Sequence, residues 1–155
     1  MTRHKKKKME DLRTRFHSAC IICGRQHPRG MKLPFRILKD GSVMTRFFCD
    51  HFLQGYAGLL HGGVIAAMLD GAMTNCLFAH GKTAVTASLT VRFLHPVAAN
   101  QTATIKARIK RSNPPLHLME SELLQGEKVM ARATAKFMEC REAFFPKPQK
   151  EKSRT

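Results

Sequence analysis

Tryptophan is absent from this chain of 155 residues, and tyrosine occurs only once. Acidic residues are also few, because 11 Asp and Glu stand against 27 Lys and Arg and leave a formal net charge of +16. Aromatic platforms that stack on nucleic-acid bases are therefore scarce, and no motif of an RNA- or DNA-binding domain accompanies the basic residues. The positive charge by itself does not indicate a nucleic-acid partner.

The excess positive charge is concentrated at the two ends of the chain. Residues 1–30 hold nine basic and two acidic residues, and residues 141–155 hold five and two, which gives +7 and +3. The remaining +6 lies on residues 31–140, a moderately basic body that suits a polyanionic ligand. Because basic ends are commonly solvated, we expect flexible tails over residues 1–19 and 141–155 around a single domain over 20–140.

The sequence also lacks a signal-peptide pattern, since no apolar stretch follows its first residues, MTRHKKKKMEDLRTRFH. Its longest apolar stretch, roughly 16–18 residues interrupted by Asp70 and Asn75, falls short of the ~20 apolar residues of a membrane span. We therefore expect a cytoplasmic protein without a membrane span. The cysteines are five, an odd number that indicates thiols rather than a disulfide framework in such a protein.

A hairpin and one helix are predicted in the first half of the chain. Asp40-Gly41 stands between two β-prone runs, LPFRIL and SVMTRFF, which is a hairpin pattern. Apolar residues with helical periodicity from Val64 to Ala79 predict one long buried helix, and His80-Gly81 ends it.

Four strand-like segments follow the predicted helix, over residues 83–94, 101–111, 116–124 and 128–139. Their connectors HPVAAN, SNPP and QGE are short, which is typical of an antiparallel meander. Polar and apolar residues alternate in ASLTVRFL and ATIKARIK, so each strand has one buried and one exposed face. The order predicts an α+β fold in which a curved antiparallel sheet wraps around one central helix.

A single carboxylate, Asp70, stands inside the uncharged run HGGVIAAMLDGAMTNCLFAHG. An unpaired charge in a buried helix is costly, so its presence there indicates a function or a partner. Gly62 and Gly63 mark the beginning of the same helix, where free backbone N–H groups bind negative charge. This segment therefore offers both an oxyanion site and a carboxylate.

The strings QGYAGLLHGGVIAAMLDGAM, TASLTVRFLHPV and GEKVMARATAKFM occur in this order in the chain. Together they resemble the hotdog-fold acyl-CoA thioesterases of the phenylacetic-acid-degradation (PaaI-like) branch, and the resemblance extends over residues 20–139. It implies a homodimer or homotetramer that hydrolyses the thioester bond of an acyl-CoA. It also implies that coenzyme A is part of the substrate and that no separate cofactor or metal is needed.

The spacing of Gly62 and Asp70 adds a geometric constraint. Eight residues separate them, which is about 12 Å along a helix at ~1.5 Å per residue. One helix cannot bring both groups to within ~3 Å of one carbonyl. If both act on the same thioester, each site combines Asp70 of one subunit with the Gly62 turn of another. Family members build such shared sites, and a two-fold axis would create two of them.

The candidate catalytic residues take separate roles. The backbone N–H of Gly62 or Gly63 would hold the thioester oxygen as it becomes negative. Asp70 would either deprotonate a water or attack the carbonyl directly, and both routes remain open. His61 either orients the turn or the thioester through a side-chain hydrogen bond or merely satisfies the backbone of the loop. By resemblance, Thr86 takes the place of a Ser or Thr that positions the water.

The candidate substrate-binding residues come from loops and strand ends. The family often has Asn or Gln where this chain has Gly55, and Gln54 is one residue out of register. Tyr56 and Leu60 supply apolar surface for an acyl group. Three strand-end cations would meet the phosphates of coenzyme A: Arg92, Lys110 and Arg111.

Cys20 and Cys23 form one CxxC pair, with His17 and His27 nearby. A structural zinc site needs four ligands in tetrahedral geometry, so this pair alone does not establish a metal site.

Two other function classes remain open. A hotdog hydratase or dehydratase would also act on acyl thioesters, but that chemistry usually pairs a histidine with a carboxylate across the dimer, whereas His61 lies within the glycine turn. A nonenzymatic module would bind an acyl-CoA or, through its basic ends, a nucleic acid.

Overall fold

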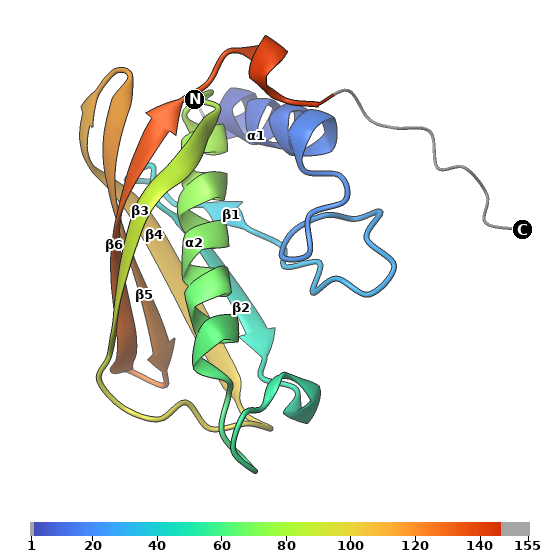
Figure 1. The fold of residues 1–155 in the computed structure, drawn as a ribbon, viewed down its shortest axis with the longest axis vertical. Helices are drawn as coiled ribbons and strands as arrows, with labels where there is room; N and C mark the ends of the chain where they lie inside the picture. The colour runs from blue at the N-terminus through green and yellow to red at the C-terminus, as the bar shows by residue number, and fades with distance from the viewer. Residues whose placement is uncertain (1, 147–155) are drawn as a thin grey trace, which may run out of the picture.

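Residues 2–146 are described by a computed structural model, in which one long helix lies against a six-stranded antiparallel sheet (Figure 1). The order along the chain is α1 (Thr2–Phe16), β1 (Arg36–Ile37), β2 (Val43–Phe48), η1 (His51–Leu53), α2 (Gly62–Ala79), β3 (Ala84–Phe93), β4 (Thr102–Asn113), β5 (Leu116–Gln125), β6 (Lys128–Glu139) and η2 (Glu142–Phe144). The α+β hotdog arrangement predicted from the sequence is confirmed.

The inner face of the sheet and α2 form one hydrophobic core. Alternate residues of the long strands point inward, so that β5 and β6 are buried at every second position over most of their length. The fully buried large side chains come from both layers and include Met68, Leu69, Met73, Ile105, Met119, Leu123 and Phe137. Each such side chain contributes about 1.5–3 kcal/mol by leaving water, so this layer contact dominates the stability of the fold.

The strand order is β1-β2-β4-β5-β6-β3, which corrects one part of the predicted topology. β4, β5 and β6 form a meander, but β3 pairs with β6 and does not contact β4 as a neighbour. The connector over residues 94–101 crosses the end of the sheet, held by backbone hydrogen bonds from Leu60 to Val97 and from Cys49 to Gln101. β4 therefore pairs with β2, and β3 takes an outer edge.

The N-terminal segment differs from the expected flexible tail, because residues 2–16 form α1. Met9, Leu12, Arg13 and Phe16 share one helix face by their three- and four-residue spacing. Met9 is 1% exposed and Arg13 is 8% exposed, and α1 packs on α2. The prediction of a tail rested on the run of four lysines and did not take this apolar spacing into account.

The C-terminal segment was also expected to be a flexible tail. Its first residues instead contact α1, since Glu142 accepts a hydrogen bond of 2.6 Å from Arg15, and the rings of Phe145 and Phe16 lie 5.0 Å apart. The rest of that predicted tail, residues 147–155, lies outside the described residues.

α2 meets the length and composition of a membrane-crossing helix, although the sequence suggested that it is too short. Two thirds (67%) of its apolar window is buried inside the protein, as expected for a core helix. The helix is therefore accounted for by the fold and does not indicate a membrane span.

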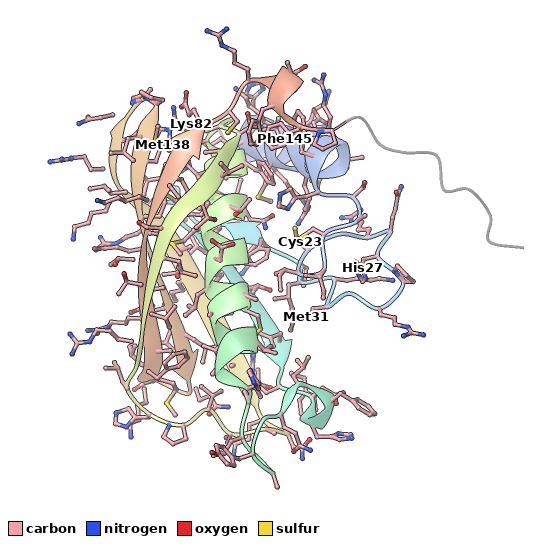
Figure 2. The ribbon with its side chains drawn as sticks, viewed as in Figure 1. Cys23, His27, Met31, Lys82, Met138 and Phe145 are labelled. Atoms are coloured by element: carbon pink, nitrogen blue, oxygen red, sulfur yellow. The ribbon has the colours of Figure 1, made fainter. Side chains whose placement is uncertain are left out.

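Replacement of Met9 by Ala tests the packing of α1. The variant Met9→Ala should lower the free energy of unfolding by about 2–4 kcal/mol, because a buried thioether side chain leaves a cavity. The control is Met138→Ala, at a position that is 37% exposed and labelled in Figure 2, where the loss should stay below about 1 kcal/mol. Denaturant titration measures both, and equally small losses would contradict the packed helix.

Candidate functional site

Asp70 lies on the middle of α2, half-buried, with its side chain directed at β3. The hydroxyl of Thr86 donates a hydrogen bond of 2.6 Å to Oδ1 of Asp70. The register of β3 against β6 shifts between Thr86 and Ser88, which marks a bulge at this position. Bulges re-aim side chains next to functional sites, and this one accompanies the contact of Thr86 with the helix.

Burial is the main influence on Asp70 and raises the pKa of its carboxyl group above the ordinary value. The hydrogen bond from Thr86 and the nearby charge of His17 act in the opposite direction and lower that pKa. The net effect is a carboxylate that holds a proton more readily than an exposed aspartate does. Such a group is a stronger base once it is ionised.

Asp70 and Thr86 line a cavity of about 210 Å³. The other walls come from α2, from the beginning of β3 and from the two chain ends, with the side chains of Phe16, His17, Thr74, Phe78, Val85 and Phe145. Phe16, His17 and Phe145 were not recognised as site residues from the sequence, because they fall in segments expected to be tails. The apolar spacing on α1 is the signal that could have identified Phe16.

The glycine turn begins α2 as predicted. His61 is the N-cap residue of the helix, and its Nδ1 accepts a hydrogen bond of 2.9 Å from the N–H of Gly63. The ring therefore satisfies the backbone, one of the two roles considered for it, and a neutral ring carries its proton on Nε2. Gly62 at the first helical position keeps an N–H without a partner among the described residues. Of the two candidate oxyanion donors, Gly62 is the available one.

A second cavity, of about 260 Å³, lies beside this helix start. It is lined by Gly62 together with two other predicted residues, Tyr56 and Leu60, and by Phe93 of β3. The structure thus brings the glycine turn and the predicted apolar surface to one place. Tyr56 is 85% exposed, so its ring is accessible to a ligand or to a partner.

The two halves of the proposed chemistry do not meet within one chain. Asp70 lines one cavity and Gly62 the other, and the two residues are separated by about 12 Å along α2 at ~1.5 Å per residue. No single thioester carbonyl reaches both groups of the same copy.

The remaining predicted residues are dispersed. Gln54 accepts a hydrogen bond of 3.0 Å from the N–H of Gly58 through Oε1, so it stabilises its own loop. Lys110 forms an ion pair of 2.9 Å with Glu120. Arg92 lies on β3, which β5 and β6 separate from the strand of Lys110 and Arg111. One copy of the chain therefore does not gather these three cations into a phosphate site.

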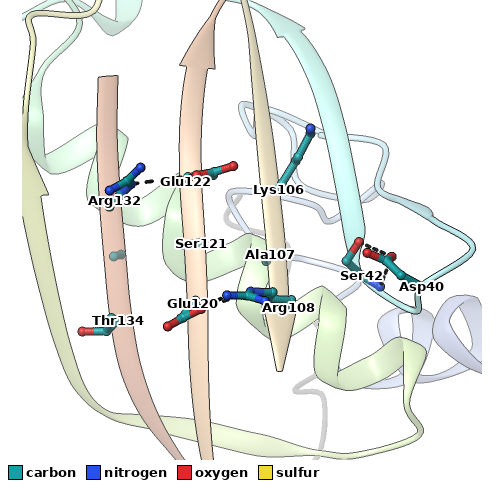
Figure 3. Close-up of a pocket in the computed structure, with 11 residues that line it drawn as sticks. Asp40, Ser42, Lys106, Ala107, Arg108, Glu120, Ser121, Glu122, Arg132 and Thr134 are labelled. Carbon is teal, nitrogen blue, oxygen red and sulfur yellow. Dashed lines mark hydrogen bonds and ion pairs between the residues drawn. The ribbon is translucent and has the colours of Figure 1, made fainter. Parts of the chain in front are cut away.

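A further hollow of about 450 Å³ lies on the outer face of the sheet, with α2 behind it (Figure 3). Its charged side chains neutralise one another across the strands. Arg108 lies 2.7 Å from Glu120, and Arg132 lies 3.9 Å from Glu122. Because Asp70 is on the other side of the sheet, this hollow takes no part in its chemistry.

Comparison with protein families matches residues 57–130 to the family described as the Thioesterase superfamily. The matched segment contains Gly62, Asp70 and Thr86. The resemblance predicted from the sequence is thereby confirmed.

A curated relative, acyl-coenzyme A thioesterase THEM4 of Bos taurus, is 37% identical over 60 residues, which cover 39% of this chain. The matched part spans about a quarter (24%) of that protein. A solved phenylacetic acid degradation-related protein of Ralstonia eutropha is 27% identical, with 68% of this chain and 83% of that chain covered and a TM-score of 0.62.

Two other solved structures share the fold. The PaaI protein of E. coli is 16% identical, with 90% of this chain and 96% of that chain covered and a TM-score of 0.75. A thioesterase protein of Streptococcus pneumoniae, solved with coenzyme A, is 18% identical over 70% of this chain and 85% of that chain, with a TM-score of 0.65. Variants of this pneumococcal protein, in which alanine replaces an aspartate or a threonine 16 positions further on, have also been solved.

The variant Thr86→Val tests the contact on which the Asp70 site rests. A hydrogen bond donated to a carboxylate favours its charged form, so removal of the hydroxyl should raise the pKa of Asp70 further above its ordinary value. Carboxyl ¹³C chemical shifts followed against pH measure this change.

Thr90→Val is the matched control for this experiment, because Thr90 is an exposed residue of the same strand and, among the described residues, the side-chain donor to Asp70 is Thr86. It should leave the titration of Asp70 unaltered. An identical titration curve in wild type and in Thr86→Val would contradict the hydrogen bond.

Proposed function

We propose that this chain, in which residues 57–130 match the thioesterase superfamily, hydrolyses the thioester bond of an acyl-CoA to a free acid and coenzyme A. The observation that carries the proposal is the half-buried Asp70, held by Thr86 at 2.6 Å on the wall of a cavity. A carboxylate with a raised pKa in such a position is suited to take a proton from water or to attack a carbonyl.

In the general-base route, the second oxygen of Asp70 accepts a proton from a water whose oxygen attacks the thioester carbon. The C–S bond then breaks, the thiolate of coenzyme A leaves with that proton, and a carboxylic acid remains. In the nucleophilic route, Asp70 forms a mixed anhydride that water hydrolyses afterwards. Water is the only co-reactant in either route, so the proposed reaction requires no cofactor.

The N–H of Gly62 is assigned to the developing oxyanion. Within residues 2–146 this N–H has no partner, and it lies at the first turn of an 18-residue helix, where the backbone dipole also favours negative charge. The cavity beside it is lined by Tyr56, Leu60 and Phe93, which offer an apolar surface to the acyl group.

Two copies of the chain are required if Asp70 and Gly62 act on one thioester. β3 supports such an assembly, because it is a ten-residue edge strand whose backbone has a sheet partner on one side only. Leu89, Phe93 and Leu94 are 36%, 55% and 40% exposed along and just after this strand. We propose a homodimer, alone or within a tetramer, in which β3 contributes to the interface and each site is shared.

The compared structures support the choice of substrate. The pneumococcal protein that shares this fold was solved with coenzyme A, and an acetyl-CoA complex of a Streptococcus mutans protein has the same fold. The aspartate and the threonine replaced in the pneumococcal variants are 16 positions apart, which equals the separation of Asp70 and Thr86 here. This coincidence of spacing supports the pairing of these two residues in the proposed site.

The variant Asp70→Asn should reduce kcat by about 10²–10⁴-fold, because it removes the group that accepts the proton. Release of free thiol from a panel of aromatic, short, medium and long acyl-CoAs measures the activity. The free energy of unfolding at neutral pH should rise by about 0.5–1 kcal/mol, since a half-buried charge is lost.

Asp11→Asn serves as the control for this variant, because Asp11 is exposed on α1 and should not affect turnover. Full turnover in a folded Asp70→Asn protein would refute the proposed role. Hydration of an enoyl-CoA without any thiol release would identify a hydratase instead.

The shared site is tested by combining two inactive variants. Gly62→Pro removes the candidate N–H donor at a helix position that accepts proline, and His61 before it already has the extended backbone that a proline requires (ψ 132°). Its kcat should fall by about 10²–10³-fold. Gly62→Ala is the control: it keeps the N–H, and its added methyl would lie 3.4 Å from Phe93, an ordinary contact.

Gly62→Pro and Asp70→Asn are then mixed by refolding in equal amounts. In a shared site, each mixed dimer regains one intact site, so activity should recover to about one quarter of the wild-type value. If each site lay within one subunit, the mixture would stay inactive, and that outcome would overturn the shared site.

A further inference from the structure

Three side chains of types that can ligate a metal ion form a cluster apart from the proposed hydrolytic residues. The side chains of His17, Cys20 and Cys23 offer Nδ1 or Nε2 and two Sγ atoms that all lie within 4.8 Å of one another. The cluster follows the end of α1 and lies beside the upper half of α2, where Cys23 is labelled in Figure 2. Nothing in the proposed hydrolysis uses these two thiols.

The backbone holds the three residues together through a compact turn. The N–H of Cys20 donates to the carbonyl of His17 at 3.1 Å, and the N–H of Gly24 donates to the carbonyl of Cys20 at 2.8 Å. A side chain at Gly24 would collide with the backbone of Ser18 and Cys20, so glycine is required for this turn. The local structure therefore places the donors before any ligand binds.

The separation of the donor atoms fits a tetrahedral zinc ion. Zinc binds sulfur at about 2.3 Å and imidazole nitrogen at about 2.0–2.1 Å, which places such donors about 3.6 Å apart in a tetrahedron. In the structure, Nδ1 of His17 and Sγ of Cys23 are 3.8 Å apart. Small side-chain rotations would suffice to bring the three donors onto one ion.

A backbone donor and a cation lie near the sulfur atoms of the cluster. The N–H of Ile22 donates to Sγ of Cys20 at 3.4 Å. Arg13 is only 8% exposed on the neighbouring face of α1, and no ion pair with a carboxylate is recorded for it within residues 2–146. A backbone N–H and a guanidinium beside the sulfur atoms complement the negative charge that thiolates carry when they bind a metal ion.

We propose that His17, Cys20 and Cys23 bind a divalent metal ion, with zinc as the ion that this donor set fits best. No fourth His, Cys, Asp or Glu of the described chain joins the cluster, so water completes the tetrahedron. His27 is not a ligand, because its Nδ1 accepts the N–H of Arg29 at 3.1 Å, and it lies on the outer part of the loop, apart from Cys23 (Figure 2).

In this proposal the bound ion, with water as its fourth ligand, cross-links two segments of the chain. It connects the end of α1 to the turn that packs on α2, and it fixes His17, which lines the Asp70 cavity. Metal binding is measured by the spectrum of a bound ion and thioester hydrolysis by thiol release, so a failure of either experiment leaves the other interpretable.

Cobalt(II) is the probe, because it replaces zinc in tetrahedral sites and absorbs visible light. The reduced full-length protein, titrated without oxygen, should bind one equivalent of Co²⁺ and show thiolate-to-cobalt charge-transfer bands together with intense tetrahedral bands in the visible range. Added Zn²⁺ should remove these bands. Zn²⁺ should also slow alkylation of two of the five thiols by at least about ten-fold.

Variants locate the ion. Cys20→Ser and Cys23→Ser should lose the bands, and His17→Ala should weaken Co²⁺ binding by about 10–100-fold. Cys140→Ser is the matched control, because this thiol is partly exposed and outside the cluster, and it should bind Co²⁺ as the wild type does. Since Cys23 is buried and its variant could unfold, circular dichroism verifies each fold, and Cys20→Ser and His17→Ala test the cluster independently.

The proposal is overturned if fully reduced protein shows no tetrahedral cobalt spectrum, or if the spectrum persists in Cys20→Ser. A Cys20–Cys23 disulfide that resists millimolar reductant would likewise overturn it and would identify the pair as a redox site instead.

Discussion

The packing of α2 against the inner face of the sheet is the interaction on which the rest of this structure depends. It buries a helix that is almost free of charge, and it places Asp70 where the sheet and the helix meet. Half-burial raises the pKa of this carboxyl group, and the same contact brings Thr86 within hydrogen-bonding distance. The core thus shifts the pKa of Asp70 as well as stabilising the fold.

If Gly62 and Asp70 act on one thioester, the length of α2 prevents one copy of the chain from providing both groups. A rigid helix keeps its first residue and its middle about 12 Å apart at ~1.5 Å per residue, and no side-chain rotation closes that distance. The free edge of β3 next to both cavities offers a way to complete the site by association. Assembly is then a chemical requirement of the proposed reaction, because each subunit supplies what the other lacks.

The N-terminal segment packs on the core although its many lysines predicted a solvated tail. Its lysines suggested a solvated tail, yet Met9 and Arg13 are buried and His17 lines the Asp70 cavity. The end of this segment also contacts the Cys20–Cys23 turn through the carbonyl of His17. In the sequence, the CxxC motif alone did not establish a metal site. Only the folded chain brings His17 beside the two thiols and leaves His27 apart from them.

The sequence by itself determined the hairpin, the central helix and the four strands after it, because the alternation of the strands, the periodic apolar run before Ala79 and the Asp40-Gly41 turn are local patterns. It also determined the separation of Gly62 from Asp70, since helix geometry is independent of context. Only the tertiary structure decided that β3 lies at the sheet edge and that the cations Arg92 and Lys110 lie apart. These outcomes depend on long connectors and on contacts between distant residues, which local periodicity does not encode.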